Sequence, residues 1–340
     1  MTLPHPLRLA LFGLPLVLAL LLALVYGLAW RPAAREAAAV DCNARAPVLQ
    51  PGQALKVMTW NVQYLAGERS VALEEVVRVL REERADVVLL QELQDGANSD
   101  QLALLQARLG QLYPCRSQAH YRKAGAIPEP WNIGAADLKL GTLSRYRIDR
   151  AERLQLPQLP ANPLRGPFNP QRALLVSYLP VRGGGRVAAI NTQLDGFAAN
   201  DDTQQRQVAR ASRLLARLQH DGTPWLLGGD LNPLPPEQQP RPALGSHGDA
   251  ADPLGRLAGS YPMIPSLEQA SGPRQAAWHT HFAKDGHEPG VGRTLDYLFH
   301  SPLLTPLDAR VRQHDTRGIA EHLPVLARLL LPALDQADTR

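Results

Sequence analysis

Acids, amides and one histidine stand in this chain at the points where apolar runs of residues end. These residues are Asn61, Glu92, Asp230, Asn232, Asp296, Glu321 and His322. A phosphodiester repels hydroxide and has a poor leaving group, so a catalyst must neutralise the phosphate, deliver water in line and stabilise the departing oxygen. Hard Mg²⁺ suits the first task because it prefers oxygen ligands and needs only one or two protein carboxylates. The residue types therefore predict metal-assisted hydrolysis of phosphoesters.

This chemistry predicts a specific role for four of these residues. Glu92 follows an apolar run and is the first candidate for a metal ligand. Asn61 can orient that carboxylate or a metal-bound water, so it is a candidate for both the metal site and catalysis. Asp230 is predicted to activate the attacking water. His322 can give the phosphate a charged hydrogen bond.

The remaining candidates support those four. Asn232 is predicted to donate a hydrogen bond to the phosphate, as a catalytic and substrate-binding residue. Either Asp296 or Glu321 could hold the ring of His322 in one tautomer. Glu321 is also a candidate metal ligand. We expect Mg²⁺ as the cofactor, with Mn²⁺ as the alternative.

The motifs around these residues resemble the endonuclease/exonuclease/phosphatase superfamily, which includes pancreatic-type deoxyribonucleases, abasic-site endonucleases and neutral sphingomyelinases. The motifs are Trp60-Asn61-Val62, Gln91-Glu92-Leu93, Gly229-Asp230-Leu231-Asn232-Pro233, Leu295-Asp296-Tyr297 and His322-Leu323-Pro324-Val325. They follow the family's order from about residue 55 to 330. The resemblance implies a four-layer α/β/β/α sandwich, in which two mixed sheets lie between helices.

The chain departs from the family pattern at two positions. The phosphodiesterase branches usually read Asn-Thr-His-Leu-Asp, whereas this chain has glutamine at Gln193. The family histidine contacts phosphate and helps to protonate the leaving group, but glutamine can only hydrogen-bond at neutral pH. Gln193 is therefore kept as a substrate-binding candidate, and it leaves a catalytically weakened binding module open as an alternative. At Glu321 the family more often has aspartate, which keeps the charge.

Composition agrees with one enzyme domain. The net charge of +4 is small for 340 residues, and the pI of about 9.2 does not by itself make a nucleic-acid binder. Two cysteines, Cys42 and Cys115, exclude a zinc-ribbon or disulfide-framework interpretation. They either form one disulfide or stay as two free thiols. A basic stretch is either a solvated face or a surface for substrate or lipid headgroups; it comprises Arg145, Arg147, Arg150, Arg153, Arg165 and Arg172.

Residues 9–30 hold no charged side chain and would span about 33 Å as a helix, against a hydrocarbon core of roughly 30 Å. We therefore expect one N-terminal transmembrane helix, with an uncleaved membrane anchor over residues 1–31. A cleaved signal sequence is the alternative, because the small residues Ala37-Ala38-Ala39 leave room for cleavage. We expect the catalytic domain to be periplasmic or extracellular, held there by the membrane anchor.

The rest of the chain divides into a linker over residues 32–54, a domain over 55–332 and a tail over 333–340. The linker is predicted from its Ala and Pro content. Strand and helix signals alternate in the domain and predict an α/β fold. Strands are expected over 57–62, 87–90, 172–180, 186–192, 224–228 and 323–331, and helices over 73–80, 101–109 and from 203. The segment 278–281 is expected to be a strand whose histidines share one face, either as a second metal site or facing solvent.

These observations predict a monomeric, membrane-anchored, Mg²⁺-dependent phosphodiesterase. A tether at the bilayer raises the local concentration of membrane-derived phosphodiesters above that of soluble targets. Phospholipid-type phosphodiesters are therefore the first candidate substrates. The expected partners are the membrane, through residues 9–30, and a phosphodiester substrate of lipid or nucleic acid. An exported nuclease is the second candidate, and a phosphate- or lipid-binding module is the third.

Overall fold

The computed structural model describes residues 30–65, 69–96, 99–123, 137–160, 169–196, 201–235, 238, 252–282 and 292–333, with residues 17, 19, 20, 23 and 27 of the N-terminal segment. Most of the predicted anchor, much of the predicted tail and Arg165 lie outside this part of the chain. No helix in these ranges is long and apolar enough to cross a membrane.

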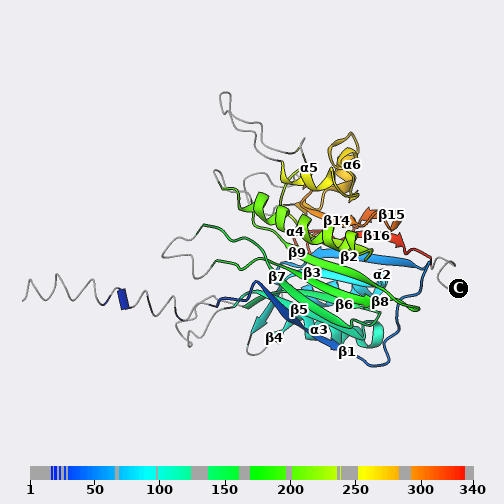
Figure 1. The fold of residues 1–340 in the computed structure, drawn as a ribbon, viewed down its shortest axis with the longest axis horizontal. Coiled ribbons are helices and arrows are strands. Elements are labelled where there is room, and N and C mark those ends of the chain that lie inside the picture. Colours follow the sequence, from blue (N-terminus) through cyan, green and yellow to red (C-terminus); the bar gives the residue numbers. More distant parts are fainter. Residues whose placement is uncertain are drawn as a thin grey trace, which may run out of the picture.

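The fold is a mixed α/β structure built on one large sheet of 14 strands (Figure 1). In sheet order, one half contains β11 (Met263–Ile264), β14 (Asp296–His300), β10 (Trp225–Asp230), β9 (Arg186–Gln193), β8 (Ala173–Pro180) and β7 (Arg150–Gln155). The other half contains β5 (Cys115–Arg122), β6 (Asp137–Ser144), β3 (Val87–Gly96), β2 (Ala54–Asn61), β16 (Val325–Leu330) and β15 (Thr305–Val311), with β4 (Ser99–Asp100) beside β3. The mixed α/β class agrees with the sequence. The two halves, however, belong to one continuous sheet.

The two halves pack face to face and share an apolar core between them. Val57 and Leu89 from one half belong to the same buried cluster as Leu226 and Leu298 from the other. A second core lies beneath α4 (Thr203–His220) and α5 (Pro253–Ala258), and a third lies beneath α2 (Arg69–Glu83) and α3 (Gln101–Leu109). The helices therefore cover the outer faces of the two halves (Figure 1).

Helix α4 shows why the sequence forms these layers. Val208, Ala211, Leu215 and Leu218 recur at helical spacing and are all buried, as the sequence predicts. Burying a leucine side chain stabilises the fold by roughly 2 kcal/mol relative to leaving it in water. The polar face of the helix stays exposed, so the stripe fixes which side of α4 meets the sheet.

Two glycines at the end of β10 permit close packing around the strand end that carries Asp230. A Cβ atom on Gly229 would lie 1.9 Å from the carbonyl oxygen of Thr192 in the neighbouring strand. A Cβ atom on Gly228 would lie 2.6 Å from Leu298 and 2.8 Å from Leu89, which belongs to the facing half. Side chains at these positions would push apart the strands that bring Asp230 to the site.

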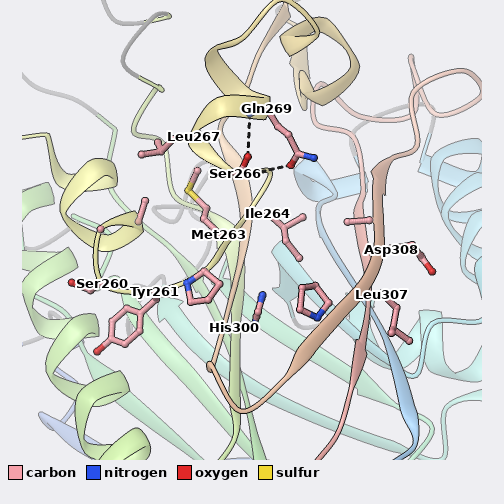
Figure 2. A pocket seen from close by; sticks show the side chains of 15 residues that line it. Ser260, Tyr261, Met263, Ile264, Ser266, Leu267, Gln269, His300, Leu307 and Asp308 are labelled. Carbon is pink, nitrogen blue, oxygen red and sulfur yellow. Dashed lines mark hydrogen bonds between the residues drawn. The ribbon is translucent and has the colours of Figure 1, made fainter.

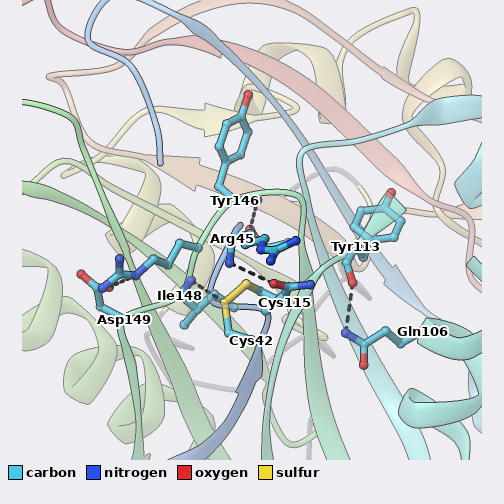
Figure 3. Close-up of a disulfide and its surroundings, with 11 residues drawn as sticks. Cys42, Arg45, Gln106, Tyr113, Cys115, Tyr146, Ile148 and Asp149 are labelled. Atoms are coloured by element: carbon cyan, nitrogen blue, oxygen red, sulfur yellow. Dashed lines mark hydrogen bonds and ion pairs between the residues drawn. A yellow bond between two sulfur atoms is a disulfide. The ribbon is translucent and has the colours of Figure 1, made fainter. Parts of the chain in front are cut away.

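The expected linker over 32–54 is wrong in its central part, because β1 (Arg35–Cys42) is a strand of the sheet. The first half of β1 pairs with β7 and the second half with β5, so β1 joins the two halves of the sheet. Cys42 pairs in register with Cys115 and forms a disulfide with it (Figure 3). This disulfide spans 73 residues, and such a loop closure contributes roughly 4 kcal/mol by restricting the unfolded chain.

Candidate active site

The ends of two parallel strand pairs meet at one edge of the fold. Strand β2 runs parallel to β3, and β9 runs parallel to β10. Asn61 ends β2, Gln193 ends β9 and Asp230 ends β10, directly opposite Gln193. Asp296 begins the antiparallel strand β14 and pairs with Asp230. The topology therefore gathers the predicted residues where the strands end.

A β-bulge in β3 determines the backbone conformation of Glu92. The pairing of β3 with β6 shifts between Leu90 and Leu93, and Glu92 has a φ of 57°, in the left-handed region. Bulges of this kind redirect side chains and recur beside active sites. Glu92 accepts a hydrogen bond of 2.6 Å from Nε2 of Gln193. Burial and the neighbouring Glu92 carboxylate raise the pKa of Tyr64 to about 12.

His322 and two acids form a buried line of groups. The ring Nδ1 of His322 lies 2.8 Å from Oδ2 of Asp296, and its Nε2 lies 3.9 Å from Oδ2 of Asp230. The indole of Trp60 donates a hydrogen bond of 2.9 Å to the carbonyl of His322. Of the two candidates for holding the ring, Asp296 makes the contact, whereas Glu321 lies 3.8 Å from Nε2 of His281.

The charges in this line influence one another. Burial acts to lower the pKa of His322, but the carboxylates of Asp296 and Asp230 outweigh it and raise the pKa to about 10. Burial raises the pKa of Asp230, although the positive His322 opposes that effect. The arrangement therefore places a cationic imidazole beside a carboxylate that accepts protons more readily than usual.

The two asparagines both contact Asp230. Asn61 donates from Nδ2 to Oδ2 of Asp230 over 3.1 Å, so it orients this acid. The backbone amide of Asn232 donates to Oδ1 of Asp230 over 3.2 Å, and its side-chain amide donates to the carbonyl of Leu194. Asn232 has a φ of 65°, which turns the chain directly after the catalytic strand.

Gln193 lies between the acids and a half-buried arginine, Arg172. Its Nε2 lies 2.6 Å from Glu92 and 3.3 Å from Asp230, and its Oε1 accepts a hydrogen bond of 2.6 Å from Arg172. Arg172 also pairs with Asp195 over 3.0 Å and stacks over the ring of Tyr121. The sequence placed Arg172 only in a basic stretch. The predicted hairpin over 172–180 and 186–192 could have indicated this role for Arg172, because its pairing brings residue 172 near the end of β9.

The expected strand over 278–281 is wrong. Residues Gln275–Trp278 form a 3-10 helix, and only His281–Phe282 form a strand, β12, paired with β13 (Gly292–Arg293). His281 packs its ring 4.7 Å from the ring of His322, whereas His279 lies against Phe282. Burial and the charge of His322 lower the pKa of His281 to about 4. Among the described residues, no acid or cysteine completes a metal site with both His279 and His281.

The site offers oxygen atoms that suit a hard cation. Asp296 Oδ1 is buried without a hydrogen-bond partner, although buried carboxylate oxygens usually have one. Ligand atoms of Asp230, Asp296 and His322 lie within 4.8 Å of one another. Because His322 is a cation, its nitrogen suits a phosphate oxygen better than a metal. The free oxygen of Asp296 and the carboxylate of Glu92 are oxygen donors of the kind that a hard divalent cation prefers.

A separate hollow of about 740 Å³ lies beside α5, β11 and α6 (Leu267–Ser271) (Figure 2). None of the catalytic candidates lines it. Its rim includes Ser266 and Gln269, which exchange hydrogen bonds in the capping box of α6. His300 reaches the hollow from β14, but its Nδ1 already bonds to the carbonyl of Ser301. Asp308 is the one acid in its lining, so the hollow lacks the group of acids that metal-assisted phosphoester hydrolysis needs.

Comparisons place the whole domain among known proteins. The sequence profile described as "Endonuclease/Exonuclease/phosphatase family" matches residues 58–316. The endonuclease/exonuclease/phosphatase from Beutenbergia cavernae DSM 12333 is 22% identical, with a TM-score of 0.59 over 82% of this chain and 72% of that one. The human Nocturnin catalytic domain with bound sulfate is 14% identical, with a TM-score of 0.54 over 86% and 96%. TDP2 of D. rerio, complexed with a single-strand DNA product, is 15% identical, with a TM-score of 0.52 over 82% and 99%. No curated protein matches the sequence.

Proposed function

Because the chain belongs to the endonuclease/exonuclease/phosphatase family, we propose that it is a metal-dependent hydrolase of phosphodiesters. The observation that carries this proposal is the line of Asp296, His322 and Asp230, with Gln193 bridging Asp230 to Glu92. The line supplies a proton acceptor for water and a cationic hydrogen-bond donor for phosphate in one place. Both are needed for attack of water on phosphorus.

A divalent cation would be held by Glu92 and by the free oxygen of Asp296, and Mg²⁺ fits these hard ligands. When bound, it would neutralise phosphate charge and make a bound water more acidic. Asn61 holds the carboxylate of Asp230, which accepts the proton of the attacking water. His322 donates to a phosphate oxygen. Gln193 donates a hydrogen bond but has no proton to give to the leaving group.

We propose a membrane-derived phosphodiester as the substrate and a membrane-anchored monomer with an exported domain as the working form. The uncharged run over 9–30 supports the anchor, and the disulfide of Cys42 with Cys115 supports an oxidising compartment. An exported nuclease is the second candidate, favoured by the likeness to a TDP2 structure that holds a DNA product. The hydrogen bond from Arg172 to Gln193 favours a weakened phosphate-binding module as the third.

The full-length protein in neutral detergent should be assayed on bis(p-nitrophenyl) phosphate, sphingomyelin and plasmid DNA. Each assay is run with Mg²⁺, with Mn²⁺ and with chelator, and Asp230→Asn is the inactive control. We expect metal-dependent cleavage of the activated diester and of sphingomyelin. Faster cleavage of plasmid DNA would favour the nuclease, and no metal-dependent turnover on any substrate would leave only the binding module.

A further inference from the structure

A groove of about 570 Å³ lies beside α4, and its lining includes none of the catalytic candidates. The arginines that line it, here called the arginine groove, are Arg35, Arg150, Arg186, Arg210 and Arg217. The acids Glu152 and Asp221 also line it, so five positive and two negative side chains leave a net charge of +3. Leu154, Leu214 and Leu218 lie beneath the groove and are almost wholly buried, so the accessible lining is mainly polar. Such a surface suits an anionic group.

Tyr178 holds two of these arginines in place. The guanidinium of Arg150 lies 4.0 Å from the centre of the Tyr178 ring, and that of Arg186 lies 5.3 Å from it. The tyrosine is itself fixed, because its hydroxyl donates a hydrogen bond of 2.6 Å to Glu152. Glu152 also pairs with Arg35. The groove is therefore preorganised around one buried acid.

The other four arginines of the groove lie beyond ion-pair distance of Glu152 and Asp221, the two acids of its lining. Among the described residues, Arg150, Arg186, Arg210 and Arg217 make no ion pair. Arg210 is half-buried, and burial together with the charges of Arg217, Arg213 and Arg35 lowers its pKa. Like charges held this close repel one another, and an anion that bound between them would remove the repulsion. Guanidinium groups bind phosphate oxygens through paired hydrogen bonds, which makes phosphate the matching anion.

We propose that the arginine groove binds the phosphate group of an anionic lipid headgroup, as a second site separate from the catalytic one. Arg35 follows closely after Trp30, the last residue of the uncharged N-terminal run. The ring of Trp30 lies 5.2 Å from the guanidinium of Arg153 on β7, whose Arg150 and Glu152 line the groove on the opposite face of the strand. The inference that the ligand is a lipid depends on the membrane location proposed above. The inference that the groove binds a phosphate group depends only on the residues of the groove.

The test uses the full chain in neutral detergent, with chelator present to prevent hydrolysis and at low ionic strength to limit screening. Calorimetry measures the binding of short-chain phosphatidylglycerol, inorganic phosphate and a short single-stranded oligonucleotide. The double variant Arg150→Gln/Arg210→Gln is compared with Arg213→Gln, an exposed neighbour on α4 that does not line the groove. We expect the double variant to weaken phosphatidylglycerol binding at least about tenfold and the control to change it less than about twofold.

Tighter binding of phosphatidylglycerol than of inorganic phosphate would support the lipid source. Stronger binding of phosphate would overturn that source, and preferential binding of the oligonucleotide would overturn the membrane assignment. An equal loss in the control would show that net charge alone attracts the ligand, which would overturn the site. Hydrolysis of bis(p-nitrophenyl) phosphate by the double variant should match wild type. If wild type hydrolyses nothing, the proposed function fails while the binding result still stands.

Discussion

Arg172 donates a hydrogen bond of 2.6 Å from Nη1 to Oε1 of Gln193, and this contact decides which end of the amide faces the catalytic acids. With its oxygen held by the arginine, Gln193 presents its NH₂ group to Glu92 and Asp230, the two acids proposed to act in the site. The amide therefore acts only as a hydrogen-bond donor toward the reaction, and the nearest fixed cation behind it is Arg172.

Replacing Gln193 with histidine should accelerate cleavage of alkyl diesters much more than cleavage of p-nitrophenyl esters. The new imidazole supplies a proton to the leaving group, and such general acid help is typically worth about 10² to 10⁴ in rate. The kcat/KM profile should gain a dependence on a group titrating near neutrality. Gln219→His on the exposed face of α4 is the matched control. Unchanged or slower rates on both ester types would show that another group already supplies the proton.

Changing Glu92 to glutamine should remove most metal-dependent turnover while the melting temperature stays close to wild type. Glu92 is the carboxylate at the bulge of β3, and an amide is a poorer ligand for a hard cation. The variant should also need more Mg²⁺ for half-maximal activity. Glu268→Gln, an exposed acid in α6, should behave as wild type. Near-normal turnover of the Glu92 variant at low Mg²⁺ would exclude this residue as the ligand.

Asp230 and His322 should act as one unit. Asp230→Asn and His322→Ala are each expected to slow kcat by several orders of magnitude, and the double variant should be little slower than either. The reason is that Nε2 of His322 lies 3.9 Å from Asp230, so both act on the same transition state. His314→Ala, at an exposed histidine, should have no effect on kcat. Losses that multiply fully in the double variant would argue for two independent sites.

Stability should fall in acid through Glu83, whose ion pairs with Lys56, Arg310 and Arg312 involve none of the candidate site residues. Burial acts to raise the pKa of Glu83, but Lys56, Arg310 and Arg312 outweigh it and lower the pKa. Because the pKa is lower in the folded than in the unfolded chain, the stabilisation is present above the unfolded value of about 4.3 and is lost as pH falls through the folded value. Glu83→Gln should lower the free energy of unfolding at pH 7 by about 3 kcal/mol.

Urea unfolding followed by tryptophan fluorescence checks this prediction. The difference between wild type and Glu83→Gln should begin to shrink as pH drops below the unfolded value of about 4.3 and should disappear as pH falls through the lower folded value, because Glu83 then becomes protonated in the folded wild type. Glu74→Gln should cost less than about 1 kcal/mol at either pH, because Glu74, on the same helix as Glu83, forms an exposed pair with Arg108 of α3. A difference that stays constant with pH would show that Glu83 stabilises the fold by packing alone.

The protein should remain in the membrane fraction after export. The uncharged run over 9–30 is long enough to span a bilayer, since its helical length of about 33 Å exceeds the hydrocarbon core. Alkaline carbonate extraction should leave the protein in the pellet. Introducing two charges near the middle of the run, Val17→Arg and Leu20→Arg, should release it because charged side chains are costly in the bilayer centre. Recovery of the wild-type protein in the soluble fraction would contradict the anchor.

Much of the site could be predicted because it lies where strands end. Asn61 and Asp230 each follow an apolar run, and the ends of parallel strands meet at one edge of a sheet. The apolar stripe of α4 was likewise legible from its spacing. These features depend on residues close together in the sequence, where side-chain periodicity reports directly on local structure.

Other features depend on contacts between distant residues. The left-handed backbone of Glu92 comes from a mismatch between β3 and β6, which no local pattern encodes. The role of Arg172 depends on its partner Gln193 in the next strand. The sequence predicts a linker where β1 lies, because the alanines of β1 are too small to show an alternation of apolar and polar residues. It is a strand because β7 and β5 each leave an edge for it.

The position of β1 also limits how the N-terminal segment can be removed during maturation. Ala37 and Ala38 pair with β7, whereas Ala39 pairs with β5. A protease that cut among these three small residues would sever the strand that joins the two halves of the sheet. The half of β1 left attached to Cys42 would keep its disulfide and its pairing with β5, but it would be separated from the half that pairs with β7. Processing that preserves the folded sheet must therefore occur before Arg35, and a shortened mature form would still begin upstream of β1.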